Sequence, residues 1–162
     1  MEYFKSISIL ELANLINASK KHLYICLPSI HSEISDAISE LHFFENHGGG
    51  NVTINILIDF DPQTIRQGYG SFDALDDLFR EGHNIKNLKN NRISFVISDD
   101  IGYYLFIESR SIIPAEKETI NAVRIDPISI IRLKKYFFPD SKKIDFKDEL
   151  SNAIIEESKF LE

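Results

Sequence analysis

Apolar and polar residues follow each other along this chain in blocks whose spacing switches between helical and extended. After Ser8 the apolar residues recur at helical spacing, and Glu11 stands three positions beyond Ser8 in a capping-box pattern. This pattern predicts a helix from Ser8 to about residues 20–21. The continuous apolar run Leu23–Leu27, closed by Pro28, predicts a strand that is buried on both faces.

The next blocks repeat the order of helix and strand. Apolar residues recur every three or four positions from 29 to 46, which predicts a helix, and the stretch 47–50 contains the glycines that end it. Apolar residues then alternate over 52–58, as in a second strand. Ser71 is placed to cap a further helix that ends near Gly82.

A hairpin is predicted in the second half of the chain. Residues 92–98 alternate, with Ile93, Phe95 and Ile97 on one side. The other, mostly polar side carries Arg92, Ser94, Val96 and Ser98. Residues 99–102 predict a tight turn and residues 103–107 the returning strand.

The predicted fold class is α/β, with a mixed β-sheet flanked by helices on both faces and a C-terminal helix. A last short strand is predicted over 122–125, and Asp126–Pro127 supplies an N-cap and a first-turn proline for a helix through about Phe138. We expect one domain over 1–139. Residues 140–162 are predicted to form a C-terminal helix or the start of a linker, and the chain is then the N-terminal domain of a larger protein.

Composition and charge favour a globular domain and argue against nucleic acid and membranes as partners. Hydrophobic residues make up 43% of the chain and charged residues 27%, as in a globular domain. The net charge is -7, from 25 acidic and 18 basic residues, so no diffuse positive field attracts nucleic acid, which we do not expect as a partner. No stretch has the ~18 apolar residues of a membrane span, so we expect no membrane contact and a cytoplasmic location.

Metals and cofactors are not predicted either. The five histidines lack the spacing to cysteine, glutamate or one another that holds zinc. The glycines at 48–50 lack the Gly-Lys-Ser/Thr that would follow in a nucleotide-binding loop. The single cysteine, Cys26, lies in an apolar strand and is expected to pack in the core.

The order of these elements resembles that of phospholipase D-like domains. Such domains carry His, any residue, Lys, four residues and Asp on the hairpin, then a small-residue and Ser segment on the returning strand. In the same register this chain has Arg92, Ser94 and Asp99, with Glu108–Ser109 after the return strand. The motif is therefore degenerate, and only its Asp is retained.

The resemblance implies how this register works in catalytic members. The His attacks a phosphodiester, the Lys holds the phosphoryl oxygens, the Asp orients the chemistry, and two copies of the motif meet at one site. An arginine at the His position, here Arg92, cannot be the nucleophile, because its guanidinium is always protonated. The resemblance thus implies a non-catalytic module used for binding or homodimeric assembly, with Val96 at the contact between two copies.

An anionic ligand is the binding partner that this register favours. Arg92 keeps a cation on the strand face, and hydroxyl groups stand beside it. The candidate ligand-binding residues are Arg92, Ser94, Ser98, Asp59, Glu108 and Ser109. Alternatively, Arg92, Ser94 and Ser98 form the solvated face of a half-buried strand, and Asp99 belongs to a hairpin turn.

Further polar residues lie where open α/β sheets collect ligands, after the first and second predicted strands. His31 and Glu33 follow the first strand and Asp59 and Asp61 the second, and these residues are expected to converge with Arg92. The alternatives are a polar first helical turn for His31 and an Asx turn for Asp59. If the chain is an enzyme, we expect a metal-independent phosphodiesterase or nuclease with a rearranged site using His31 and Asp99. A sensor domain in which Arg92 binds an anionic metabolite is a third hypothesis.

Overall fold

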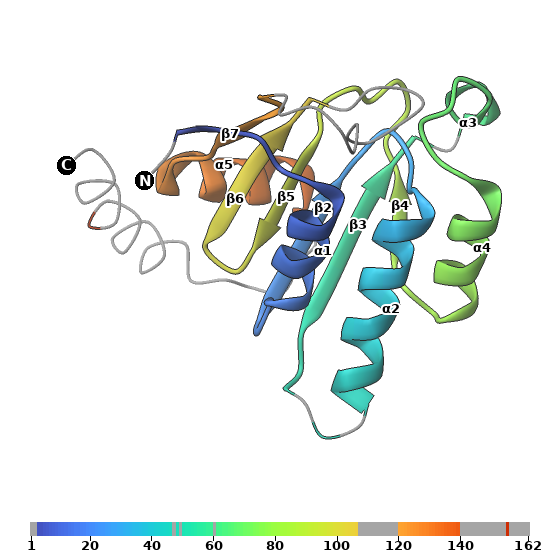
Figure 1. Ribbon diagram of the computed structural model, residues 1–162, viewed down its shortest axis with the longest axis horizontal. Coiled ribbons are helices and arrows are strands. Elements are labelled where there is room, and N and C mark those ends of the chain that lie inside the picture. Colours follow the sequence, from blue (N-terminus) through green and yellow to red (C-terminus); the bar gives the residue numbers. More distant parts are fainter. Residues whose placement is uncertain are drawn as a thin grey trace.

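A mixed sheet forms the centre of the molecule (Figure 1). The computed structural model describes residues 3–46, 48, 50–59, 61–106, 120–139 and 155. Its strands are β1 (Phe4–Lys5), β2 (His22–Cys26), β3 (Thr53–Ile58), β4 (Ile85–Asn87), β5 (Phe95–Ser98), β6 (Ile101–Leu105) and β7 (Ala122–Arg124). Its helices are α1 (Ile9–Asn17), α2 (Ser32–Asn46), α3 (Pro62–Arg66), α4 (Phe72–Arg80) and α5 (Pro127–Phe137).

The sheet joins a parallel half to an antiparallel half. Within the described residues the strand order is β1-β7-β6-β5-β2-β3-β4. Strands β2, β3 and β4 are parallel, and every other pairing is antiparallel. Because β2 and β3 end side by side, the loops that follow them meet at one edge of the sheet, which we call the carboxyl edge.

Helices cover both faces of the sheet, which confirms the predicted fold class. Helices α1, α2 and α4 pack on one face through a core that includes Leu12, Ile16, Ile34 and Leu78. Helix α5 lies on the opposite face, where Ile130 and Phe138 pack with Tyr24 and Phe95 (Figure 1). Strands β2 and β5 are consequently buried on both sides.

The predicted helix starts are confirmed by their caps. Ser8 and Glu11 form the capping box of α1. Ser71 accepts a hydrogen bond from the backbone of α4, and Asp126 does the same at the start of α5, which has proline in its first turn. Gly82, just beyond α4, has a φ of +82°, the left-handed conformation that glycine adopts without strain.

The structure corrects several boundaries. Strand β5 begins at Phe95, so Arg92 and Ser94 lie in the loop before it. The prediction that Val96 lies on an exposed face is wrong, because its side chain is fully buried against α1 and α2 and is unavailable to a second copy. The short elements β1, β4 and α3 were not predicted. The predicted C-terminal helix over 140–162 lies outside the described residues, apart from Ile155.

Candidate functional site

The carboxyl edge brings together the ends of β2 and β3 and the loop 88–94 that enters β5. The chain stays paired as it leaves the sheet: Leu27 N donates to Leu57 O at 3.1 Å, and Asp59 N donates to Pro28 O at 3.0 Å. Leu88 N donates to Ile58 O at 2.7 Å, which ties the third segment to the same edge. The backbone of all three segments is therefore fixed where their side chains meet.

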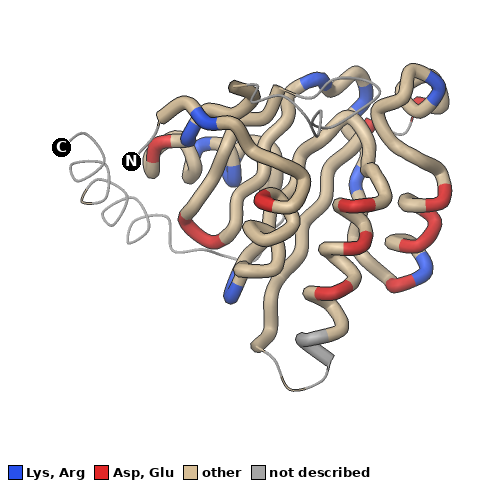
Figure 2. The backbone as a smooth tube through the Cα atoms, in the orientation of Figure 1, with Lys and Arg blue, Asp and Glu red and all other residues tan. Residues whose placement is uncertain are grey.

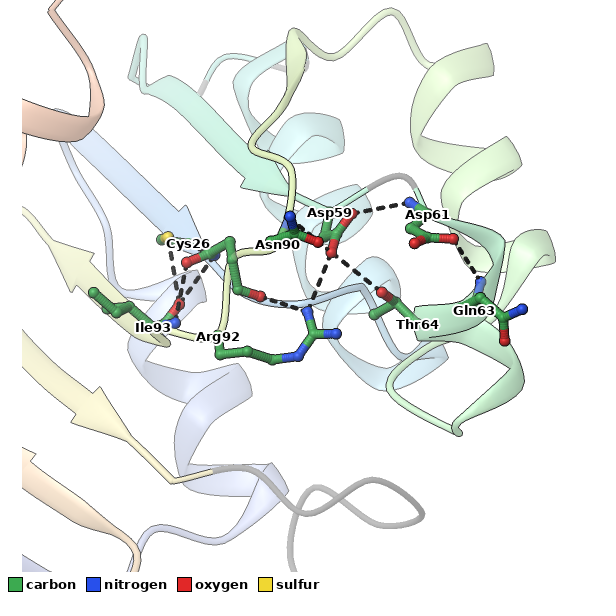
Figure 3. A network of polar contacts seen from close by, with 9 residues as sticks. Cys26, Asp59, Asp61, Gln63, Thr64, Asn90, Arg92 and Ile93 are labelled. Carbon is green, nitrogen blue, oxygen red and sulfur yellow. Dashed lines mark hydrogen bonds and ion pairs between the residues drawn. The ribbon is translucent and has the colours of Figure 1, made fainter.

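Asp59 is the centre of this edge. Its carboxylate is 2% exposed. Oδ1 accepts from Asp61 N at 3.0 Å, whereas Oδ2 accepts from Thr64 Oγ1 at 3.3 Å, Asn90 N at 3.2 Å and Arg92 Nη1 at 3.1 Å (Figure 3). Burial alone would raise the pKa of Asp59, but these hydrogen bonds and the guanidinium charge outweigh it and hold the pKa below its ordinary value.

Arg92 is held at one end and open at the other. Its Nη1 atom donates to Asp59 and, at 2.8 Å, to Asn91 O. The guanidinium carbon lies 5.7 Å from the centre of the Tyr69 ring, within the range of a cation–π contact. The side chain remains 50% exposed. Arg92 thus turns Nη1 toward Asp59 (Figure 3), and its half-exposed guanidinium is a pre-positioned cation.

The loop that carries Arg92 is shaped by two asparagines that sequence reasoning missed. Asn90 has a φ of +61°, which asparagine tolerates better than most residues. The buried Asn91 side chain accepts from Ile93 N at 3.0 Å, and donates to Ile93 O at 3.1 Å and to Cys26 Sγ at 3.2 Å. The paired asparagines before a strand were the signal for such a turn.

Cys26 lies under this loop in the core. Burial raises the pKa of its thiol to about 12, and the hydrogen bond from Asn91 opposes that rise only in part. The thiolate is the reactive form of cysteine, so this residue is inert at neutral pH and packs as a core side chain.

His31 and Ser29 follow β2 and line the inner part of the same edge. His31 Nε2 and Ser29 Oγ are both covered and have no hydrogen-bond partner. Burial lowers the pKa of His31, and the nearby Glu33 charge opposes the shift without cancelling it, so the ring is neutral at pH 7. Gly70 packs against Ser29 so closely that a Cβ there would lie 2.7 Å from Ile30 O.

Of the remaining motif positions that the structure describes, Ser94 lies at this edge, in the loop before β5, whereas Ser98 and Asp99 lie at the other end of β5. Ser94 and Ser98 are buried, so they are not a solvated strand face. Ser98 lies at the far end of β5, where its hydroxyl is 2.7 Å from that of Ser19. The structure therefore does not bring Ser98 together with Arg92. The candidates Glu108 and Ser109 lie outside the described residues.

Asp99 forms a clamp at the far end of the sheet. Its carboxylate accepts from Lys20 N at 2.9 Å, Lys21 N at 2.8 Å and His22 N at 2.9 Å. Burial would raise the pKa of Asp99, but these backbone donors outweigh it and lower the pKa. Its φ of +56° fits the predicted hairpin turn. Asp99 fixes the start of β2 and is separated from Arg92 by the length of β5.

Among the described residues, the carboxyl edge combines the half-exposed cation of Arg92 with the covered imidazole of His31. Residues 92–106 contain no histidine and no lysine, so this stretch of the hairpin offers neither a histidine nucleophile nor a second cation. Within the described residues, no cluster of three or more His, Cys, Asp or Glu side chains could hold a metal ion. In the same part of the chain no helix is long and apolar enough to cross a membrane.

Comparisons with known proteins agree with the architecture. No family model matches the chain. No curated protein matches it in sequence. Among solved structures, Nuc from Salmonella typhimurium, a phospholipase D family member, has a TM-score of 0.53 at 16% identity, with 90% of this chain and 88% of Nuc covered.

Two larger proteins are also similar. Phosphatidylserine synthase from Haemophilus influenzae Rd KW20 has a TM-score of 0.51 at 12% identity, covering 97% of this chain and 42% of the synthase. TrmBL2, an archaeal chromatin protein, has a TM-score of 0.48 at 13% identity, covering 81% of this chain and 46% of its own. The chain thus spans less than half of these two proteins. With its mixed sheet and its likeness to Nuc, the chain has a phospholipase D-like α/β fold.

Proposed function

We propose that this chain is a non-catalytic phospholipase D-like module that binds a small anionic ligand at the carboxyl edge. The observation that carries the proposal is the state of Arg92, which is anchored through Nη1 by the buried Asp59 and is still 50% exposed. A guanidinium fixed in this way presents its remaining N–H donors with little conformational entropy left to lose.

The carboxyl edge is less acidic than the protein as a whole. Lys and Arg are spread over the molecule, with some in the loops beside α3 and others on β1 and α5, whereas many of the Asp and Glu residues follow helices α2 and α4 (Figure 2). The carboxyl-edge segments 59–71 and 88–94 contain Arg66, Lys89 and Arg92 against Asp59 and Asp61. Asp59 is neutralised by Arg92, and Asp61 caps α3. With Glu33 after β2 counted as well, acidic and basic residues balance at this edge, although the protein as a whole is acidic.

The test is a binding titration that separates Arg92 from general charge. We expect isothermal titration with a small phosphodiester to give saturable binding, and Arg92→Gln to weaken it ~10- to 100-fold, as expected for a charged hydrogen bond worth about 1.5–3 kcal/mol. Arg132→Gln, an exposed position on α5, is the matched control and keeps full affinity. Equal affinity in the two variants would refute a site at Arg92.

A phosphodiesterase or nuclease with a rearranged site is the second candidate, and the fold is equally compatible with it. It is favoured by His31, whose Nε2 has no partner and whose lowered pKa leaves the ring neutral and able to accept a proton. Hydrolysis of a chromogenic phosphodiester in the presence of a chelator, abolished in His31→Ala and retained in His83→Ala, would establish this alternative. If the protein does not hydrolyse the phosphodiester, the enzyme alternative is refuted and the binding module remains the proposed function.

We also propose that the module self-associates and works in the cytoplasm. With Val96 buried, the contact must use another surface, and large apolar side chains are exposed on the described part of the chain, among them Phe4, Ile93 and Tyr136. Light scattering at increasing concentration is expected to show a dimer. A monomer at every concentration would refute self-association without affecting the proposed ligand site.

A further inference from the structure

A second basic cluster lies on β1, β6 and β7, apart from the carboxyl edge. Lys5, Tyr103 and Arg124 sit on adjacent strands: Lys5 is in register with Ala122, and Arg124 with Tyr103. Residues directly opposite each other share a face of the sheet. Ala122 belongs to the core under α1 and α2, and Tyr103 packs against it, so the cluster lies on that face of the sheet.

Two cations share one tyrosine ring in this cluster. Lys5 Nζ lies 5.8 Å and the Arg124 guanidinium carbon 5.5 Å from the centre of the Tyr103 ring. Arg124 Nη1 also donates to the Tyr103 hydroxyl at 3.4 Å. All three side chains are half-buried. A cation–π contact stabilises each cation, but it leaves both positive charges uncompensated.

Neither cation has a carboxylate partner among the residues that the structure describes. Arg124 Nε is covered and donates to no acceptor. An unsatisfied buried donor is destabilising, and native structures usually supply its acceptor. Two half-buried positive charges side by side favour an anionic ligand at this position.

The backbone that carries the cluster is rigid. Asn121 accepts from Ile7 N at 2.8 Å and donates to Ile7 O at 3.1 Å, which fastens the chain between β1 and α1 to β7. Arg124 N donates to Tyr3 O at 2.8 Å. Lys5 and Arg124 consequently have a fixed separation before any ligand arrives, and a bound oxyanion loses little free energy in ordering the site.

We propose that Lys5, Tyr103 and Arg124 form a second ligand site that takes a small oxyanion, a carboxylate or a phosphate. The planar guanidinium of Arg124 suits the oxygens of such a group, Lys5 supplies the second charge, and the Tyr103 hydroxyl is a third polar contact. Binding at this site does not depend on Arg92 and involves no catalytic step.

Amide chemical shifts of the ¹⁵N-labelled full chain test the proposal. Inorganic phosphate and malonate, titrated separately at constant ionic strength, distinguish the two sources of oxyanion. We expect saturable shifts at 3–7, 101–105 and 121–125 with at least one of them. Arg124→Gln and Lys5→Gln should each weaken the binding ~10-fold or more, and Arg132→Gln should leave it unchanged.

Two results would overturn the proposal. One is the absence of saturable shifts in these segments with both anions. The other is equal weakening by Arg132→Gln, which would indicate general screening. Amide shifts at 59–71 and 88–94 report binding at the Arg92 site in the same spectra, and Arg92→Gln should remove only those shifts. The absence of binding at one site is therefore distinguished from its absence at the other.

Discussion

Replacing Asp59 by asparagine is expected to cost a large share of the stability of this domain. The new amide side chain would keep one carbonyl oxygen, and the better orientation places it where Oδ2 of Asp59 meets Thr64, Asn90 and Arg92. The amide nitrogen then faces the Asp61 N–H, a donor against a donor. The substitution weakens three hydrogen bonds and breaks the fourth.

The magnitude follows from these contacts. Hydrogen bonds to a charged group contribute about 1.5–3 kcal/mol and neutral ones about 0.5–1.5 kcal/mol, so three bonds that lose their charge lose about 3 kcal/mol together. The unsatisfied pair adds about 1 kcal/mol or more, which gives a total of about 3–5 kcal/mol. For a domain of this size that lowers Tm by roughly 6–20 °C.

The assay is urea unfolding followed by far-UV circular dichroism, since the chain has no tryptophan for fluorescence. Asp61→Asn is the matched control, because asparagine caps a helix as well as aspartate, and it should change stability by less than about 0.5 kcal/mol. Arg92→Gln should cost about 1–2 kcal/mol, since the half-exposed guanidinium is partly solvated. A loss below about 1 kcal/mol for Asp59→Asn would refute the reasoning.

Acid should expose the same interaction. Because the pKa of Asp59 is lower in the folded state than in the unfolded chain, its stabilising contribution is complete above its ordinary pKa of about 3.9 and is lost as the pH falls through the folded value. The free energy of unfolding should therefore fall less for Asp59→Asn than for the natural chain as the pH is lowered from 6 to below the folded-state pKa of Asp59. Equal slopes would contradict this assignment.

Three further predictions concern the frame around the site. Gly70→Ala should destabilise the domain by about 1–3 kcal/mol in the same urea assay, because its Cβ would meet backbone at 2.7 Å, whereas Gly50→Ala, with its nearest atom at 3.8 Å, should be neutral. Asp99→Ala should lower Tm more than Asp99→Asn, which keeps one acceptor oxygen and tolerates the φ of +56°; the opposite order would refute the clamp. Cys26 should react with a thiol reagent only after unfolding, and fast labelling of the native protein would contradict its raised pKa of about 12.

The longer helices were predicted from patterns of residues that lie close together in the sequence. The Ser8–Glu11 pair, Ser71 and Asp126–Pro127 marked three helix starts because capping depends on residues within one turn. Strand β1 has two residues and β4 has three, too few for any period to be recognised. Helix α3, with five residues, was not predicted for the same reason.

The sequence indicated the edge where the site lies more clearly than the contacts within it. The position of Asp59 after a predicted strand indicated that it lies at the carboxyl edge of the sheet. Its pairing with Arg92, 33 positions later, depends on the turn made by Asn90 and Asn91. The face of Ser94, Val96 and Ser98 looked solvated because alternation of polar and apolar residues usually marks one wet face. Here both faces are covered: Ser94 and Ser98 are buried, and the Ser98 hydroxyl lies 2.7 Å from that of Ser19, just beyond α1.

The pairing of β1 with β7 constrains how the chain folds as it is synthesised. Asn121 bonds to Ile7 across 114 positions, so β1 cannot find its neighbour until nearly the whole described chain has left the ribosome. The parallel strands β2, β3 and β4 can meet earlier, and β5 can join them next. Because closing so large a loop is slow, β1 is the last strand to be placed, and a nascent chain keeps one open sheet edge until then.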